Sequence, residues 1–178
     1  MGKPDPLLAA AIHELGKQKR LAEAALAQLK DDELHIRLNA QQNSIAVIMR
    51  HLAGNMLSRW TDFLTTDGEK PGRNREGEFA DTRIPRAELM RQWEAGWKRL
   101  LNAMNALTDA DLLKTVTIRN EPHTVMLAIV RQISHYGGHI GQILLLAKHI
   151  TLARGRTWTY LTIAPGGSEQ FNKRMGMT

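Results

Sequence analysis

Residues 125–153 read VMLAIVRQISHYGGHIGQILLLAKHITLA and contain the most apolar stretch of the chain, from Met126 to Ile150. The isoleucines and leucines recur at helical spacing, which predicts a helix from about Val125 to Ala153. Polar side chains interrupt the stretch at Arg131, Gln132, His135, His139, Gln142 and Lys148. Because these interruptions are too frequent for an ordinary membrane span, we expect a helix of the protein core and no membrane-spanning segment.

Three further helices are expected before this one, each with apolar residues at helical spacing. Their expected ranges are Leu7–Leu34 (after the start signals Asp5 and Pro6), Asn43 or Ser44 to Thr66, and Pro85 to about Ala106. Four long helices with almost no strand predict an all-α fold, an up-down four-helix bundle. No composition shift divides the sequence, so residues 1–178 are expected to form a single domain.

The connecting segments carry signals of their own. Residues 68–83 are charged and glycine-rich without any period, which predicts a long surface loop after the second helix. Between Leu113 and His123, Thr and Val flank an Asn-Glu-Pro turn, so a short hairpin or an extended link is expected before the fourth helix. Beyond Pro165, a short helix capped by Ser168 is expected.

The composition limits the chemistry of the protein. The chain has no cysteine, which excludes disulfides, thiolate nucleophiles and thiolate metal ligands. The net charge is +6, from 24 Lys and Arg against 18 Asp and Glu, but the basic residues are scattered along the chain. We therefore expect a solvated surface and disfavour nucleic acid as a partner. The N-terminal sequence lacks the apolar run of a signal peptide, which favours a cytoplasmic location.

His135 and His139 are the strongest candidates for metal ligands. They lie four residues apart on the predicted fourth helix, so their imidazoles share one face and could reach a common ion at about 2.0–2.1 Å. An exposed pair, or a pair satisfied within the core, is the alternative interpretation. The intervening residues, Tyr136, Gly137 and Gly138, lack the glutamate of a zinc-protease helix, which disfavours peptidase chemistry.

A third ligand is needed for a tight site, and His51 on the predicted second helix is the candidate. Its helical face also carries Ser44, Asn55, Ser58 and Asp62. The same pattern is typical of the wet side of an amphipathic helix, so the spacing alone leaves both interpretations open.

Three segments together resemble a known family: residues 43–79, residues 133–150 (ISHYGGHIGQILLLAKHI) and residues 158–172 (WTYLTIAPGGSEQFN). They are similar to the DinB-like (YfiT-type) superfamily of candidate metalloenzymes, and to a branch of it without an assigned function. The resemblance implies a four-helix bundle, commonly a homodimer. It also implies one divalent ion (Zn, Ni or Fe-like) held by His51, His135 and His139.

The resemblance further implies a class of chemistry, because some members are transferases or isomerases that use low-molecular-weight thiols. We expect a metal-dependent enzyme with S-transferase-like or hydrolytic activity on a small molecule, with its catalytic residues unassigned. A non-catalytic metal- or ligand-binding bundle and a nucleic-acid-binding stress protein are the alternatives. The candidates for supporting the imidazoles are Ser44, Asn55, Asp62, Gln132 and Gln142, and those for covering the site are Arg73, Arg75 and Arg83.

Overall fold

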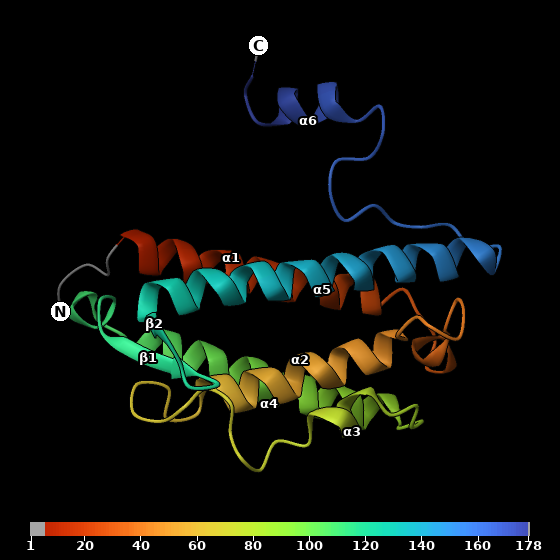
Figure 1. Ribbon diagram of the computed structural model, residues 1–178. Helices are drawn as coiled ribbons and strands as arrows, with labels where there is room; N and C mark the ends of the chain where they lie inside the picture. Colours follow the sequence, from red (N-terminus) through yellow and green to blue (C-terminus); the bar gives the residue numbers. More distant parts are fainter. Residues whose placement is uncertain (1–5, 178) are drawn as a thin grey trace.

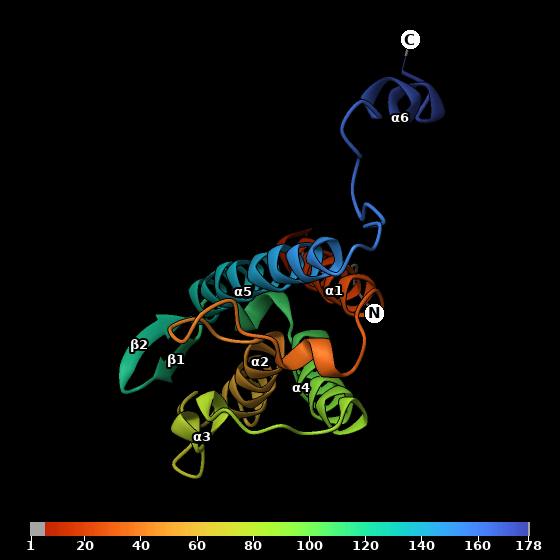
Figure 2. The same ribbon diagram turned by 90° about the vertical axis from the view of Figure 1, so that its right-hand side faces the viewer.

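The computed structural model describes residues 6–177, so the expected start signal Asp5 lies outside the described residues. The chain is mostly helical with one small two-stranded sheet, which confirms the coarse prediction. Its long helices are α1 (Pro6–Leu26), α2 (Ile45–Trp60), α4 (Arg86–Ala106) and α5 (Val125–Ala153). Helices α1 and α5 pack side by side as one layer, and α2 and α4 form a second layer against it (Figures 1 and 2). No helix within residues 6–177 is long and apolar enough to cross a lipid bilayer.

The helix directions differ from a simple alternating order. Figure 1 shows α1 and α5 running one way and α2 and α4 both running the other way. The chain must therefore return along the molecule between α2 and α4, and residues 61–85 make this return. The segment expected to be only a surface loop contains the short helix α3 (Arg75–Phe79). This return brings α3 against α2, beside the candidate histidine His51.

The layers are held together by large buried side chains. Trp93 and Trp97 of α4 are fully buried, as is Tyr136 of α5. The Trp60 indole N–H donates to the Tyr136 hydroxyl at 3.0 Å, and that hydroxyl donates to the Asn55 side-chain oxygen at 3.0 Å. Tyr136 therefore ties α5 to α2 one residue away from His135.

Two helices end earlier than expected. Helix α1 stops at Leu26 rather than Leu34, and a short 3₁₀ turn (Asp32–His35) follows. There the buried Glu33 carboxylate accepts the backbone N–H of Lys30 and pairs with Arg156, a residue that lies far away in the sequence. Helix α2 stops at Trp60 rather than Thr66, because Thr61 adopts an extended backbone and the following Asp62 a positive φ of 45°, neither of which continues an α-helix.

The connection before α5 is a hairpin, the first of the two structures expected there. Strand β1 (Thr115–Ile118) pairs antiparallel with β2 (Glu121–Thr124). The turn lies at Arg119 and Asn120, both with positive φ, so it begins one residue before the Asn-Glu-Pro sequence and shares only Asn120 with it. A type I′ hairpin turn needs this left-handed backbone at both central residues, because its backbone twist then matches the twist of the strands.

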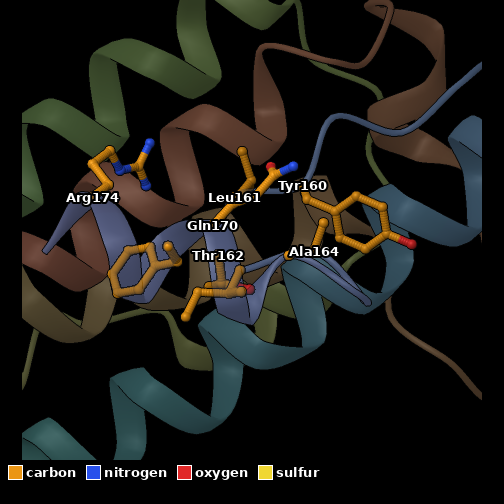
Figure 3. A pocket seen from close by; sticks show the side chains of 9 residues that line it. Tyr160, Leu161, Thr162, Ala164, Gln170 and Arg174 are labelled. Carbon is orange, nitrogen blue, oxygen red and sulfur yellow. The ribbon is translucent and has the colours of Figure 1, made fainter. Parts of the chain in front are cut away.

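The last helix of the C-terminal segment stands away from the rest of the molecule, whereas Arg156 and Thr159 at the start of the segment hydrogen-bond to Gln28 just after α1. Helix α6 (Ser168–Arg174) follows residues 154–167, and both views show it apart from the two layers (Figures 1 and 2). Its N-cap is Gly167, with no side-chain cap hydrogen bond, so the expected capping role of Ser168 is wrong. A hollow of about 480 Å³ lies within this segment, lined by Tyr160, Leu161, Phe171 and Arg174 among others (Figure 3). It contains no candidate metal ligand.

Candidate metal centre

The three candidate histidines are presented by two well-anchored helices. The Ser44 hydroxyl caps α2 by accepting the Val47 N–H at 3.3 Å, so Ser44 serves the helix and not the imidazoles. The Thr124 hydroxyl caps α5 in the same way by accepting the Leu127 N–H at 3.1 Å. These caps fix where each helix begins, and thereby which face of it turns toward the other.

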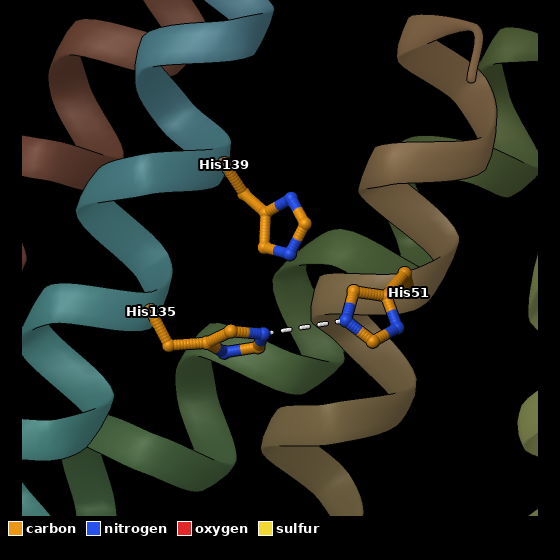
Figure 4. Close-up of side chains that lie close together, drawn as sticks. All are labelled: His51, His135 and His139. Atoms are coloured by element: carbon orange, nitrogen blue, oxygen red, sulfur yellow. Dashed lines mark hydrogen bonds between the residues drawn. The ribbon is translucent and has the colours of Figure 1, made fainter. Parts of the chain in front are cut away.

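His51, His135 and His139 point toward one another across the gap between α2 and α5 (Figure 4). His51 Nε2 lies 3.4 Å from His135 Nε2. The His139 ring centroid lies 5.0 Å from that of His51 and 4.8 Å from that of His135. One ring nitrogen from each histidine can be chosen so that all three lie within 4.8 Å of one another. The structure thus brings together the three predicted residues.

The spacing of one nitrogen pair is compatible with a shared ion and is long for a direct hydrogen bond. Two nitrogens bound at about 2.0–2.1 Å to one tetrahedral ion lie roughly 3.4 Å apart. The observed 3.4 Å between His51 Nε2 and His135 Nε2 agrees with this value. An N–H hydrogen bond is usually shorter, at about 2.7–3.2 Å. The donor set therefore fits a divalent ion that accepts imidazole ligands.

Glu78 of α3 orients His51. Its Oε2 lies 3.0 Å from His51 Nδ1, and the Arg73 guanidinium binds both carboxylate oxygens at 2.8 Å. Burial opposes ionisation, but the hydrogen bonds from His51 and Arg73 hold the pKa of Glu78 below its usual value. The ionised carboxylate can only accept, so His51 carries its proton on Nδ1. This leaves the Nε2 lone pair free to face the other histidines.

The sequence did not predict Glu78, because it lies in a segment without a period. A signal for it exists on α2, where Gly54 lies in mid-helix. A Cβ atom at this position would lie 2.1 Å from the Glu78 Oε1. Only glycine leaves room there for the carboxylate. Because glycine has no side chain, α3 can approach α2 closely at this point.

The other two imidazoles differ in their support. His139 Nδ1 donates to the Gln142 side-chain oxygen at 3.0 Å, so Gln142 is the one predicted supporting residue that contacts a histidine. His135 Nδ1 is buried and has no hydrogen-bond partner among residues 6–177. Of the remaining candidates, Asn55 binds Tyr136 and Asp62 forms the turn after α2. The Gln132 side-chain oxygen is buried without a partner among the described residues.

The two candidate imidazoles of α5, His135 and His139, favour the neutral form. Burial, reinforced by the neighbouring His139 and His51, lowers the pKa of His135 to about 4. Burial also lowers the pKa of His139. Metal ligation requires the unprotonated ring, so both side chains are available as ligands at neutral pH.

A cavity of about 300 Å³ opens beside the three histidines. Glu69 and Phe79 contribute to its walls, together with the following arginines: Arg59, Arg73, Arg75, Arg119 and Arg131. Arg73 and Arg75 thus take the place predicted for them, whereas Arg83 does not line the cavity. Sequence reasoning missed Arg59, Arg119 and Arg131, because they come from α2, the hairpin turn and α5.

Comparison with protein families gives a match that covers most of the chain. The model of the family described as "Protein of unknown function (DUF1572)" matches residues 4–167. Comparison with the curated proteins gives no match.

Proposed function

Since this chain belongs to the DUF1572 family, whose description states no activity, we propose from the site itself that it is a divalent-metal-dependent enzyme acting on a small molecule. The observation that carries the proposal is the convergence of three imidazoles within 4.8 Å beside a cavity. His51, His135 and His139 would hold one ion of the zinc, nickel or iron type. Three protein ligands leave a position open for water or substrate, as in catalytic rather than structural sites.

The surroundings of the site favour a nucleophile that comes from outside the protein. The ion would supply Lewis acidity, which lowers the pKa of water or of a thiol toward neutrality. Among the residues that line the cavity in the described part of the chain there is no serine, threonine or lysine, and the chain has no cysteine. A low-molecular-weight thiol or water would therefore act as the nucleophile, in an S-transferase-like or a hydrolytic reaction.

The residues of the chain contribute positioning and electrostatics. Glu78 and Arg73 hold His51 in one tautomer, and Gln142 does the same for His139. Phe79 covers the His51 ring at a centroid distance of 4.8 Å, which limits the access of water to that side. The arginines favour a substrate with negative charge.

We also propose that the fold is the DinB-like four-helix bundle. Its support is the packing of α1, α2, α4 and α5 in two layers, with the histidine pair on the last long helix and the third histidine on the second. A solved structure of a DUF1572 member compared with a DinB-like protein would test this assignment. A cytoplasmic location remains a proposal that cell fractionation would test.

A homodimer is proposed from one face of α5. Four large apolar residues on it are half-exposed or more: Leu127, Val130, Leu145 and Leu152. Gly138 and Gly141 lie between them, with open space where a Cβ would be. A second copy could approach this face closely and also contact the outlying C-terminal segment. Light scattering should give a mass of two chains for the wild type. The Leu145→Glu variant should have the mass of a single chain.

Two alternatives are separated by direct measurement. A non-catalytic metal-binding protein would bind the ion at this site and show no turnover. A nucleic-acid-binding protein would bind DNA or RNA with a steep dependence on salt.

The decisive test combines metal content with activity. Protein loaded with zinc, nickel or iron is assayed with panels of thiols and electrophiles and with hydrolysable esters. His135→Ala is expected to lose both the ion and the activity, whereas His149→Ala, which changes an exposed histidine of the same helix, should keep both. A fully loaded wild type without turnover on any panel would favour the non-catalytic alternative.

A further inference from the structure

Arg59 is a buried cation whose hydrogen-bonding capacity is largely unused. Only 5% of its side chain is exposed. Its Nε and Nη1 atoms are buried and have no hydrogen-bond partner among residues 6–177. An unpaired buried charge is costly, and proteins rarely retain one without a partner. Arg59 lines the same cavity as the three histidines.

The nearest acidic group does not satisfy Arg59. Its Nη2 lies 3.9 Å from the Glu69 carboxylate, beyond hydrogen-bond distance. The same carboxylate lies closer to Arg73, at 3.1 Å, and to Arg119, at 3.5 Å. Glu69 therefore shares one negative charge among three arginines, and most of the positive charge at Arg59 is uncompensated.

The guanidinium is held in place by packing. A Cβ on Gly68 would lie 2.6 Å from Arg59 Nη1, so the loop after α2 presses directly onto the side chain. Gly68 is itself fixed, because its N–H donates to Thr117 of β1 at 2.8 Å and its carbonyl accepts the Ser58 hydroxyl at 3.1 Å. The side chain is thus oriented before any ligand binds, which reduces the entropic cost of binding.

The electrostatics of the cavity favour an anion. Burial lowers the pKa of Arg59; Tyr136 and Glu69 oppose this effect, and the positive charges of Arg131 and Arg73 add to it. Five arginines line the cavity against one glutamate, Glu69. An oxyanion placed between Arg59 and Arg131 would relieve the repulsion between these cations.

We propose that Arg59 and Arg131 form an anion-binding subsite beside the three histidines, which takes the carboxylate or phosphate group of a small substrate. The planar guanidinium of Arg131, which is 45% exposed, offers a fork of N–H donors that matches both groups, and the buried positive charge of Arg59 adds to the attraction. A cavity of about 300 Å³ is at the lower end of the size range of small-molecule sites, so the ligand is a small anionic metabolite. That the anion belongs to a substrate rests on the proposed function. Binding of the anion itself needs no metal.

The test measures anion binding to the metal-free full-length protein by calorimetry, with inorganic phosphate in one titration and malonate in another. We expect the wild type to bind both anions, or only the anion that fits the subsite better. Arg59→Gln should weaken binding roughly 10- to 100-fold, as expected for loss of hydrogen bonds from a charged group. Arg99→Gln, which removes an equal charge from an exposed position of α4, should leave the affinity unchanged.

A second variant protects the test against misfolding. Arg131 is 45% exposed, so Arg131→Gln should fold normally and still weaken binding. The proposal is overturned if the wild type binds neither anion at millimolar concentration. It is also overturned if the control Arg99→Gln loses as much anion affinity as the two test variants, Arg131→Gln and a correctly folded Arg59→Gln. Uptake of zinc, nickel and iron by the wild type is measured in parallel: failure to bind any of them would defeat the proposed metalloenzyme but leave the anion site standing.

Discussion

Replacement of Glu78 by glutamine tests how the protein prepares its histidines for a metal. The carboxylate accepts one hydrogen bond from His51 and two from Arg73. A glutamine of the same shape has only one acceptor oxygen, so its NH₂ group must face either His51 Nδ1 or Arg73. The Arg73 side chain is only 5% exposed, and after the change its charge has Glu69 as its remaining partner.

The magnitude follows from these contacts. Loss of a carboxylate that orients a metal-bound histidine typically lowers metal affinity about 10- to 100-fold. Removing one partner of a buried ion pair costs about 3–5 kcal/mol, and the remaining contact of Arg73 with Glu69 places the expected loss at about 3 kcal/mol or less. Zinc affinity is measured by competition with a chelator, and the free energy of unfolding by denaturant titration.

The matched control is Glu76→Gln, which changes a neighbouring glutamate of α3 whose side chain is 87% exposed. It should alter neither quantity. Equal zinc affinities for Glu78→Gln and the wild type would refute the reasoning that Glu78 fixes the His51 tautomer for metal binding.

Further predictions follow from the same contacts. Because the pKa of His135 is lowered to about 4 from 6.5, the unfolded chain takes up its proton first. The metal-free protein should therefore lose stability as the pH falls from about 6.5 toward 4, and His135→Gln should flatten this dependence in denaturant titrations. Gly54→Ala should displace the Glu78 carboxylate and weaken zinc binding, whereas Gly141→Ala, with open space around it, should not. Tyr136→Phe leaves the Trp60 indole N–H without its acceptor and should lower the free energy of unfolding by about 1–3 kcal/mol.

The helices with strong local signals were predictable from sequence. Helix α5 has the expected bounds, because its apolar period is long. Its start is fixed by the preceding β-segment and by the N-cap Thr124. Helix α4 begins at Arg86, within one residue of the expected start at Pro85, although Pro85 is the N-cap residue and not the first helical residue. The same periodic pattern placed His51, His135 and His139 on helices, and the resemblance indicated that they meet.

The features that depend on distant contacts were not predictable. At the end of α1, Arg86 donates to the Leu26 and Leu29 carbonyls and Arg156 donates to the Gln28 carbonyl, and no local pattern reveals these contacts. Helix α3 was missed although Asn74 caps it by accepting the Gly77 N–H at 2.9 Å, because a helix this short has no apolar period. The unpaired guanidinium of Arg59 could not be predicted, because its burial depends on the fold of the loop at Gly68.

The central claim is that three imidazoles bind one ion, and X-ray absorption spectroscopy of the zinc-loaded protein tests it most directly. The wild type should show three imidazole nitrogens at about 2.0–2.1 Å from zinc, and His51→Ala should show only two. A wild-type spectrum with oxygen ligands alone, or an unchanged spectrum in His51→Ala, would contradict the account.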